Sequence, residues 1–367
     1  MRYYLLAGEA SGDLHTAHLV TAIRALDPDA ELRGWGGDLM AEAGVEVVKH
    51  YRELAFMGFV EVVQNLPTIL GNLKRAKADI LAYRPDVLVL IDYPGFNLRI
   101  AKWARRQGLR VAYYISPQIW AWNSGRARAI ERDVDLMLCI LPFEPAFYQK
   151  YGMQTTFVGH PLLDVIPPLP DEQPALHSPR RVLLLPGSRQ QEIARMLPLM
   201  LAVDLPDTEL VIAGAPGRTR ELYETLIAAS GRSDGVSLYM NRTYEWLPRV
   251  DAAVVTSGTA TLETALFGVP QVVVYKGSPV SYWLARRLIN VSYISLVNLI
   301  LDRPLVSELI QGRATPTTIT AELQQLLHPD RRTRLWQGYR ELRQMLGGPG
   351  ASSRAATAIV RLASGNK

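Results

Sequence analysis

A turn of small residues at 256–259 is the first stretch of this chain that could carry chemistry. It separates an apolar run at 252–255, which predicts a buried strand, from a helix that ends near Gly268. Ser257 or Thr259 is the expected N-cap of that helix. Backbone N–H groups at a helix N-terminus lack partners within the helix and lie at the positive end of its dipole, so they attract phosphate. An ordinary strand–helix turn in a parallel sheet is an equally good interpretation of this segment alone.

Side chains around this turn suit the same anionic ligand. Hydroxyls at Ser257, Thr259 and Thr261 add hydrogen-bonding groups beside the backbone of Gly258. Glu263 lies about one turn inside the helix and on the same face, where its carboxylate can accept from sugar hydroxyls. The segment therefore predicts a binding site for a phosphate that is attached to a sugar or nucleotide.

A second strand–turn–helix unit brings an arginine to the same kind of position. The sequence RVLLLPGSRQQEI at 181–193 predicts a strand, a turn with Ser188 and Arg189, and a helix. Arg189 would face the same crevice as the first turn and neutralise a diphosphate. Lys276, which follows an apolar strand, adds a second positive charge. With these cations and a helix N-terminus, a metal ion is unnecessary, and we expect no cofactor.

Carboxylates follow two predicted strands in the N-terminal half. Glu9 and Ser11 come after the strand 3–7, and Asp92 ends the apolar run DVLVLID. Parallel sheets bind ligands at the carboxyl ends of their strands, and a carboxylate there is rarely placed for packing. Asp92 is therefore the leading catalytic candidate, with Glu9 as the alternative. Asp13, in the predicted helix 13–26, is interpreted as a helix cap.

The first of these turns excludes one class of enzyme. The sequence GEASGD lacks the third glycine of the dinucleotide fingerprint, and no acidic residue ends the next segment, which reads Arg33-Gly34-Trp35-Gly36-Gly37. A nicotinamide-dependent dehydrogenase is not expected.

The chain is long enough for two domains, and its prolines show where they divide. It has 367 residues, and prolines 167, 168, 170, 174 and 179 make 166–180 a semi-rigid linker. We predict an α/β fold with two Rossmann-like, doubly wound domains at 1–165 and 181–346, facing each other across a cleft. The helix in 347–367 is expected to pack back on the first domain. This is the layout of a GT-B type glycosyltransferase, in which the sugar nucleotide docks on the C-terminal domain.

Composition restricts the environment and the partners. The net charge of +5 and the sequence pI of about 9.2 fit an anionic partner. The single Cys139 lies in an apolar run, so a disulfide is excluded and a buried, inert thiol is expected. The six histidines are scattered; His15 and His18 lack a third ligand, and His160 could reach the site from the hinge. No signal peptide and no apolar run of about 20 residues is present, which favours a cytoplasmic protein.

Two surface features leave alternatives open. The apolar segment 57–73 is followed by Lys74, Arg75 and Lys77, which is typical either of a core helix or of a segment that meets an anionic bilayer. Trp120 and Trp122 beside Arg126 and Arg128 could contact nucleic acid, but a loop and an exposed helix face explain them as well, and we expect no nucleic-acid partner.

Ten motifs in order between Leu5 and Asn298 give the chain a specific resemblance. It resembles lipid-A-disaccharide synthases through AGEASGDLH, GWGGDLMAEAGVE, MGFVEVV, IDYPGFN, YYISPQIWAW, LPFEPAFY, FVGHPLLD, LLPGSRQQEI, TSGTATLETALFGVPQVVVYK and YISLVNLI. The resemblance implies catalysis by Asp92. Contacts in the loop and turn motifs are implied for Glu9, Ser11, Arg189, Glu192, Ser257, Thr259, Glu263 and Asn298. Many members carry a second aspartate where this chain has Gly95, which leaves Asp92 alone in that motif.

The resemblance also implies a reaction and a location. The expected substrates are UDP-2,3-diacylglucosamine and 2,3-diacylglucosamine 1-phosphate, and the expected products are a β-1,6-linked disaccharide 1-phosphate and UDP, formed with inversion. The enzyme would sit peripherally on the cytoplasmic face of the inner membrane, in contact with anionic lipid, and a homodimer is compatible with the sequence.

Two other functions compete with this one. Another UDP-N-acetylhexosamine enzyme, such as a 2-epimerase or a peptidoglycan-precursor transferase, is disfavoured by the segment 57–73 and the GE-x-SGD loop. A non-catalytic lipid- or nucleotide-binding protein is disfavoured by the presence of Asp92, Arg189 and Glu263 together.

Overall fold

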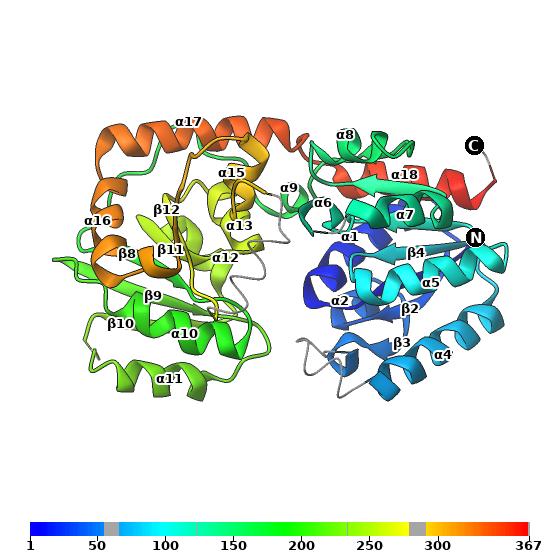
Figure 1. Ribbon diagram of the computed structural model, residues 1–367, viewed down its shortest axis with the longest axis horizontal. Helices are drawn as coiled ribbons and strands as arrows, with labels where there is room; N and C mark the ends of the chain where they lie inside the picture. Colours follow the sequence, from blue (N-terminus) through cyan, green and yellow to red (C-terminus); the bar gives the residue numbers. More distant parts are fainter. Residues whose placement is uncertain (55–65, 123, 233, 279–290, 366–367) are drawn as a thin grey trace. The chain divides into compact units, whose positions relative to one another are not determined.

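The computed structural model describes residues 1–54, 66–122, 124–232, 234–278 and 291–365. It divides them into two compact units. Unit 1 is formed by Met1–Asp164 and Leu346–Lys367, and unit 2 by Val165–Met345 (Figure 1). The chain therefore passes between the units twice, after Asp164 and again before Leu346. Each unit is a parallel β-sheet covered by helices.

The sheet of unit 1 is parallel throughout, in the order β3-β2-β1-β4-β5-β6-β7. Its strands are β1 (Arg2–Ala7), β2 (Glu31–Gly36), β3 (Glu46–His50), β4 (Val87–Ile91), β5 (Val111–Tyr114), β6 (Leu136–Cys139) and β7 (Thr156–Phe157). Its helices are α1 (Ala10–Leu26), α2 (Asp38–Glu42), α4 (Leu66–Tyr83), α5 (Pro94–Arg106), α6 (Ile119–Trp122), α7 (Ala127–Asp133), α8 (Glu144–Gln149), α9 (Leu162–Val165) and α18 (Ala351–Ala363).

Unit 2 repeats this plan with six strands in the order β10-β9-β8-β11-β12-β13, again all parallel. Its strands are β8 (Arg180–Leu185), β9 (Thr208–Gly214), β10 (Val236–Met240), β11 (Ala252–Thr256), β12 (Gln271–Tyr275) and β13 (Ser307–Ile310). Its helices are α10 (Gln190–Leu201), α11 (Arg220–Ala229), α12 (Thr243–Trp246), α13 (Thr259–Leu266), α15 (Leu296–Leu301), α16 (Pro316–Leu326) and α17 (Pro329–Met345).

Central strands are apolar because helices cover both faces of each sheet. Every residue of β4 is fully buried, and so are the four apolar residues 252–255 of β11. The buried Cys139 ends β6, and burial raises the pKa of its thiol, as expected for an inert core cysteine. The predicted α/β class with parallel sheets is confirmed.

The C-terminal helix α18 belongs to unit 1. It packs against α1 and lies against β4, β5 and β6 (Figure 1). Asp164 fixes its start, because its carboxylate accepts from the backbone N–H groups of Gly350, Ala351 and Ser352 at 2.6, 3.2 and 2.9 Å. A carboxylate at this end of a helix is favourable for both hydrogen bonding and the helix dipole.

The proline-rich segment 166–180 is fastened to unit 2. Arg332 donates to the carbonyl of Pro174, and Arg340 to the carbonyls of Pro170 and Asp171, all from α17. Arg343 on the same helix donates to the carbonyl of Ile166. The segment is thus held along α17 by arginine side chains, although its composition alone suggests a spacer.

Helix α4 runs without a break through two residues that suggest an interruption. It begins at Leu66, so Pro67 lies in the first turn, where its missing N–H removes no intrahelical bond. Gly71 is exposed within the helix. Residues 57–65 of the predicted membrane segment lie outside the described part of the chain.

Candidate active site

The candidate residues of both units lie where the strand order reverses. In unit 1, β1 and β4 are neighbours, and the turns that follow them carry Glu9 and Asp92. In unit 2, β8 and β11 are neighbours, and the turns after them carry Arg189 and Ser257. From β1 and from β8 the chain winds outward in one direction and then in the other, and this switch point is where parallel α/β sheets generally bind ligands. The sheet topology therefore brings the predicted residues together in two sets, one in each unit.

The backbone of Asp92 is strained and firmly held. Asp92 and Tyr93 have φ angles of 43° and 47°, in the left-handed region that most L-residues avoid. The carbonyl of Asp92 accepts from Asn97 Nδ2 at 2.9 Å and from the hydroxyl of Tyr113 at 2.5 Å. Its N–H donates to the carbonyl of Tyr114 at 3.1 Å. These contacts turn the chain sharply out of β4 and set the direction of the Asp92 side chain.

The carboxyl group of Asp92 is a poor acid for an aspartate. Burial raises its pKa, the negative charge of Glu9 raises it further, and a hydrogen bond from the backbone of Tyr93 lowers it, with a net pKa of about 7. The N-cap of α5 is Tyr93, and no side-chain cap bond is formed there. Asp92 is therefore not the cap of α5, and its shifted pKa suits proton transfer near neutral pH.

Tyr93 and Asn97 join the turn after β4 to the turn after β1. A Cβ on Gly8 would lie 2.4 Å from ring atoms of Tyr93, so the ring packs directly on the glycine. Asn97 Nδ2 also approaches the carbonyls of Leu6 and Ile91, at 3.3 and 3.1 Å. This packing holds Glu9 close enough to influence the pKa of Asp92. Neither residue was a sequence candidate, although both lie in the IDYPGFN motif.

The helix after β1 begins earlier than the sequence predicts. It starts at Ala10, with the half-buried Glu9 as N-cap residue, whereas the glycines at 8 and 12 suggested a loop up to Gly12. Ser11 is exposed in the first turn. Gly12 is helical because its small size allows the helix to approach β1: a Cβ there would already lie 3.3 Å from Ala7 Cβ.

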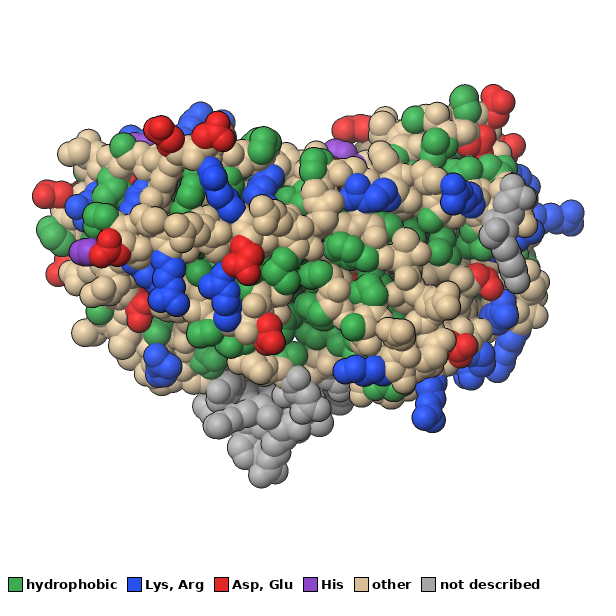
Figure 2. Space-filling model, turned by 90° about the horizontal axis from the view of Figure 1, so that it is seen from above, with side chains coloured by type: hydrophobic (Ala, Val, Ile, Leu, Met, Phe, Trp, Pro, Cys, Tyr) green, Lys and Arg blue, Asp and Glu red, His purple; other side chains and the backbone are tan. Residues whose placement is uncertain are grey.

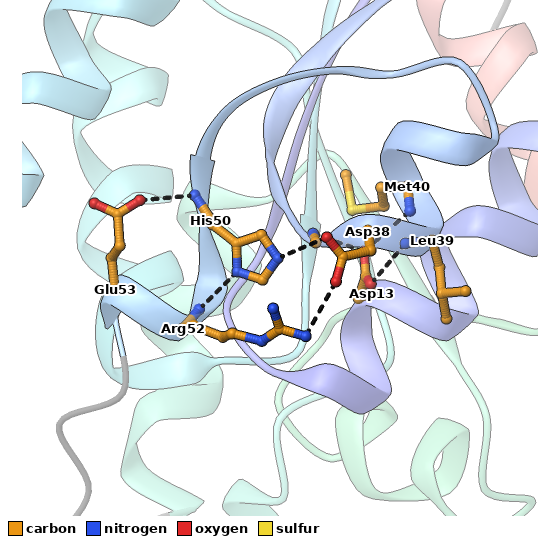
Figure 3. Close-up of polar contacts among 8 residues, drawn as sticks. Asp13, Asp38, Leu39, Met40, His50, Arg52 and Glu53 are labelled. Carbon is orange, nitrogen blue, oxygen red and sulfur yellow. Dashed lines mark hydrogen bonds and ion pairs between the residues drawn. The ribbon is translucent and has the colours of Figure 1, made fainter. Parts of the chain in front are cut away.

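Asp13 is a helix cap, but of a neighbouring helix. Its carboxylate accepts from the backbone N–H groups of Gly37, Leu39 and Met40 at 2.7, 3.2 and 3.1 Å (Figure 3). Gly37 is the N-cap residue of α2, and the other two lie in its first turn. On the same side, Asp38 pairs with Arg52 at 3.0 Å. Asp13 thus ties α1 to the loop after β2, and its oxygens are occupied by this structural task.

His160 does not reach the candidate site. It is 3% exposed, its Nδ1 accepts from the N–H of Leu162 at 3.2 Å, and its own N–H donates to the carbonyl of Leu346. Burial lowers its pKa to about 3 and that of the nearby His15 to about 4. Both imidazoles are buried and neutral, so they serve the packing of unit 1 and are not exposed to a ligand. Within the described residues, no group of three or more His, Cys, Asp or Glu is arranged to hold a metal ion.

In unit 2, the turn after β11 is capped by its backbone. Gly258 is the N-cap residue of α13, and no side chain caps the helix, so neither Ser257 nor Thr259 has the predicted cap role. Ser257 Oγ donates to the carbonyl of Ile294 at 2.8 Å. Thr261 is buried and donates to the carbonyl of Gly258 at 2.8 Å. Thr259 is exposed at the start of α13, and the N–H of Thr261 donates to the carbonyl of Gly258 at 3.1 Å.

Arg189 starts the helix after β8 and pairs within its own motif. Its backbone N–H donates to Glu192 Oε2 at 3.3 Å, and its guanidinium lies 3.4 Å from Glu192 Oε1. Ser188 beside it is exposed. Glu192 also packs over Gly187, where a Cβ would lie 2.8 Å from Oε2. The Arg189 side chain is 64% exposed, so solvent screens its ion pair with Glu192.

Lys276 and Glu263 lie beside these two turns. The exposed Lys276 follows β12, and its carbonyl accepts from Arg195 of α10 at 3.3 Å, which links α10 to the end of β12. Glu263 accepts from the hydroxyl of Tyr244 at 2.7 Å, and burial raises its pKa. Tyr244 was not a sequence candidate; it orients the carboxylate that we expected to meet a sugar.

Asn298 is placed in the interior of unit 2, away from ligand. It is 1% exposed, its Nδ2 donates to the carbonyl of Val306 and to Glu308, and its Oδ1 accepts from the N–H groups of Leu305 and Val306. Both N–H groups and both oxygen lone pairs of the amide are thus used within the protein. The structure therefore gives Asn298 a positioning role.

The aromatic–basic stretch that suggested nucleic acid has a structural explanation at Trp120. Its Nε1 donates to the buried Glu144 at 3.2 Å, and its ring stacks edge-on against Phe143 at 4.9 Å. Side chains of Trp122 lie outside the described part. On the face shown in Figure 2, Lys and Arg side chains are interspersed with Asp and Glu, without the continuous basic track that binds nucleic acid.

No helix within the described residues is long and apolar enough to cross a bilayer.

Comparison with known proteins adds the family to this geometry. The family model described as lipid-A-disaccharide synthetase matches residues 3–360. The lipid-A-disaccharide synthase of Myxococcus xanthus is 42% identical over 98% of this chain and 97% of the relative, and that of Syntrophus aciditrophicus is 42% identical over the same shares.

Solved structures show the fold. A UDP-GlcNAc 2-epimerase from Neisseria meningitidis bound to UDP-GlcNAc aligns with a TM-score of 0.62 and 12% identity over 100% of both chains. The spinosyn rhamnosyltransferase SpnG aligns with a TM-score of 0.60 and 15% identity, over 98% of this chain and 100% of that one. At identities of 12–15%, these structures show only that the fold is shared, whereas the two synthases are 42% identical over almost the whole chain. With its IDYPGFN, PGSRQQE and SGTATLE turns placed at the switch points of two parallel sheets, the chain belongs to the lipid-A-disaccharide synthase family.

Proposed function

We propose that this protein is a hexosyltransferase that joins UDP-2,3-diacylglucosamine to 2,3-diacylglucosamine 1-phosphate. The acceptor 6-hydroxyl oxygen attacks the donor anomeric carbon, the bond from that carbon to UDP breaks, and the anomeric configuration inverts. The products are the β-1,6-linked disaccharide 1-phosphate and UDP. Membership of the family over residues 3–360 is the single observation that carries this proposal.

The proposed base is Asp92. It takes the proton of the attacking hydroxyl, and a pKa of about 7 makes its carboxylate a stronger base than an ordinary aspartate while leaving it substantially ionised at neutral pH. Glu9, whose charge contributes to that pKa, is the second candidate. The switch point of unit 1 is thereby the proposed acceptor site.

The proposed diphosphate site is the switch point of unit 2. Arg189, Lys276 and the N-terminus of α13 would stabilise the negative charge that develops as UDP departs. Three sources of positive potential at neighbouring strand ends support a reaction without a metal ion or another cofactor. We therefore propose a metal-independent transferase.

The alternatives are less well supported. A 2-epimerase or a peptidoglycan-precursor transferase would share the architecture, but the UDP-GlcNAc 2-epimerase from Neisseria meningitidis is only 12% identical to this chain, against 42% for the two synthases. A non-catalytic binding protein would not need a carboxyl group with a raised pKa at a strand end.

We further propose contact with the anionic inner leaflet of the inner membrane from the cytoplasmic side. Helix α4 presents Leu70, 57% exposed, one turn before the exposed Lys74 and Arg75. Sedimentation with anionic vesicles should retain the protein, and reversal of both charges (Lys74→Glu with Arg75→Glu) should release it. Equal recovery of both proteins in the supernatant would contradict this contact.

The decisive experiment for the reaction is a two-substrate assay. Incubation with UDP-diacylglucosamine and the acylated sugar phosphate should yield disaccharide 1-phosphate and UDP in equal amounts, with or without EDTA. UDP release without disaccharide, or epimerised UDP-sugar, would contradict the transferase assignment. Loss of activity in EDTA that returns with a divalent cation would contradict only metal independence.

A further inference from the structure

A carboxylate at the edge of the sheet of unit 2 collects four hydrogen bonds. Glu308 lies in β13, which pairs with β12. Its Oε1 accepts from Ser295 N–H at 3.0 Å, Ser295 Oγ at 2.8 Å and Asn298 Nδ2 at 2.9 Å, and its Oε2 accepts from Ile294 N–H at 3.0 Å. All four partners donate. The site is therefore built for an ionised carboxylate, which only accepts.

The segment that Glu308 holds is in direct contact with the turn after β11. The carbonyl of Ile294 accepts from Ser257 Oγ at 2.8 Å. Ser257 N–H in turn donates to the carbonyl of Val274 at 3.2 Å, which fixes it to β12. One continuous path thus runs from Glu308 through Ile294 to Ser257. Because Ser257 gives its hydroxyl hydrogen to Ile294, that hydrogen is not available to a phosphate.

We propose that Glu308 is a positioning residue for nucleotide binding, acting through Ile294 and Ser257. The inference rests on the proposed function, in which the first turn of α13 binds the diphosphate of the donor. Ser257 sets the direction of that turn, and Glu308 sets the position of the carbonyl to which Ser257 is bonded. The diphosphate itself meets the backbone N–H groups of the turn and Thr259.

Glutamine at 308 tests the charge with almost no change in shape. It replaces one carboxylate oxygen by an NH2 group, which faces a donor and cannot accept. The matched control is Glu322→Gln. Glu322 accepts from Ser307 Oγ at 2.6 Å, and Ser307 precedes Glu308 in β13. Within the described residues, Glu322 makes no hydrogen bond or ion pair with 294–298. Both variants lose one negative charge in the same region.

Titration calorimetry with UDP separates the outcomes. Glu308→Gln should weaken the Kd for UDP about tenfold, the size expected for disrupting a charge-assisted hydrogen bond, and Glu322→Gln should stay within about twofold. Wild-type binding with an unchanged Kd in Glu308→Gln would overturn the inference alone. A wild-type protein that does not bind UDP would overturn the proposed function and this inference with it.

A double-mutant cycle distinguishes positioning from general damage to the fold. If Glu308 acts through Ser257, the effect of Glu308→Gln on the Kd should largely disappear in a Ser257→Ala background, while its effect on Tm remains. Equal weakening in both backgrounds would overturn the proposal. If Glu308→Gln does not fold, Glu308→Asp, which keeps the charge but shortens the side chain, should show the same dependence on Ser257.

Discussion

The ring of Tyr93 covers Gly8 so closely that a Cβ at residue 8 would lie 2.4 Å from the Cγ and Cδ1 of the ring. This contact joins the turn that carries Asp92 to the turn that carries Glu9. The two carboxylates influence one another because these turns are packed together. The absence of a side chain at residue 8 allows the turns to pack this closely.

Gly8→Ala should therefore damage both stability and turnover. The added methyl group has to displace the Tyr93 ring, at a cost of about 1–3 kcal/mol in unfolding free energy, and it moves the Asp92 turn with it. Gly95→Ala is the control in the same motif, because a Cβ there meets no atom within 4 Å. Thermal unfolding and turnover should fall in the first variant only. Normal turnover in Gly8→Ala would show that the spacing of the two turns is not needed for catalysis.

Asp92→Asn should abolish most turnover and leave the fold intact. Loss of a general base lowers turnover about 10²–10⁴-fold, while UDP, which we place on unit 2, should bind with normal affinity. In the wild type, kcat should rise with pH through about 7 as Asp92 ionises. The pKa of Asp92 is higher in the folded protein than in the unfolded chain, where it is about 4. Asp92 therefore lowers the unfolding free energy progressively as pH rises from about 4 to 7. The asparagine variant should thus melt no earlier than wild type at pH 8.

Near-normal turnover in Asp92→Asn would transfer the role of base to Glu9. The same kinetics and melting measurements on Glu9→Gln would then decide whether the charge that raises the pKa of Asp92 is itself the proton acceptor.

Arg189→Ala should affect catalysis far more than stability. The ion pair with Glu192 is exposed and contributes little to the fold, so Tm should barely change. Neutralisation of the leaving diphosphate is worth roughly 2–4 kcal/mol, which is a loss of about 30- to 1,000-fold in kcat/KM. Arg189→Lys should recover only part, because lysine cannot bind two oxygens as a fork. Unchanged kcat/KM in the alanine variant would remove Arg189 from the site.

The sequence was most informative where one strong pattern determines the outcome. Continuous apolar runs such as 87–91 identified the central strands, and chemistry-bearing residues directly after them identified both switch points. Short strands at the sheet edge were not predicted. Strand β13 has four residues, of which only one is buried, so its sequence has no periodic apolar pattern. Glu308 was missed for that reason.

Hydrogen-bond partners were beyond sequence reasoning because they depend on tertiary packing. Asp13 is of a residue type that often caps its own helix, but the fold brings the start of α2 to its carboxylate. Ser257 is of a residue type that often binds phosphate, but its hydroxyl donates to the carbonyl of Ile294, 37 residues away. Asn298 lies in a motif of the family and proves to be buried. Motifs thus indicated the candidate residues, whereas the hydrogen-bond partners of those residues depend on the tertiary fold.

The two buried histidines should each lower the unfolding free energy in mild acid. Burial holds the pKa of His160 at about 3 and that of His15 at about 4, below the ordinary value of 6.5. The unfolded chain therefore binds more protons below pH 6.5, and each histidine should remove about 1.4 kcal/mol of stability per pH unit between about 6.5 and 4. Glu144 and Asp92, whose pKa values are raised to about 7, act in the opposite direction, so the wild-type slope is a difference between these terms and those of the histidines.

Comparison with His160→Asn isolates one of these terms. The variant removes a group that titrates only in the unfolded state, so its unfolding free energy should fall less steeply from pH 6.5 to pH 4.5 than that of the wild type, by up to about 1.4 kcal/mol per pH unit. Denaturant unfolding at several pH values provides the measurement. Parallel pH profiles for wild type and His160→Asn would mean that His160 binds a proton in the folded protein as readily as in the unfolded chain.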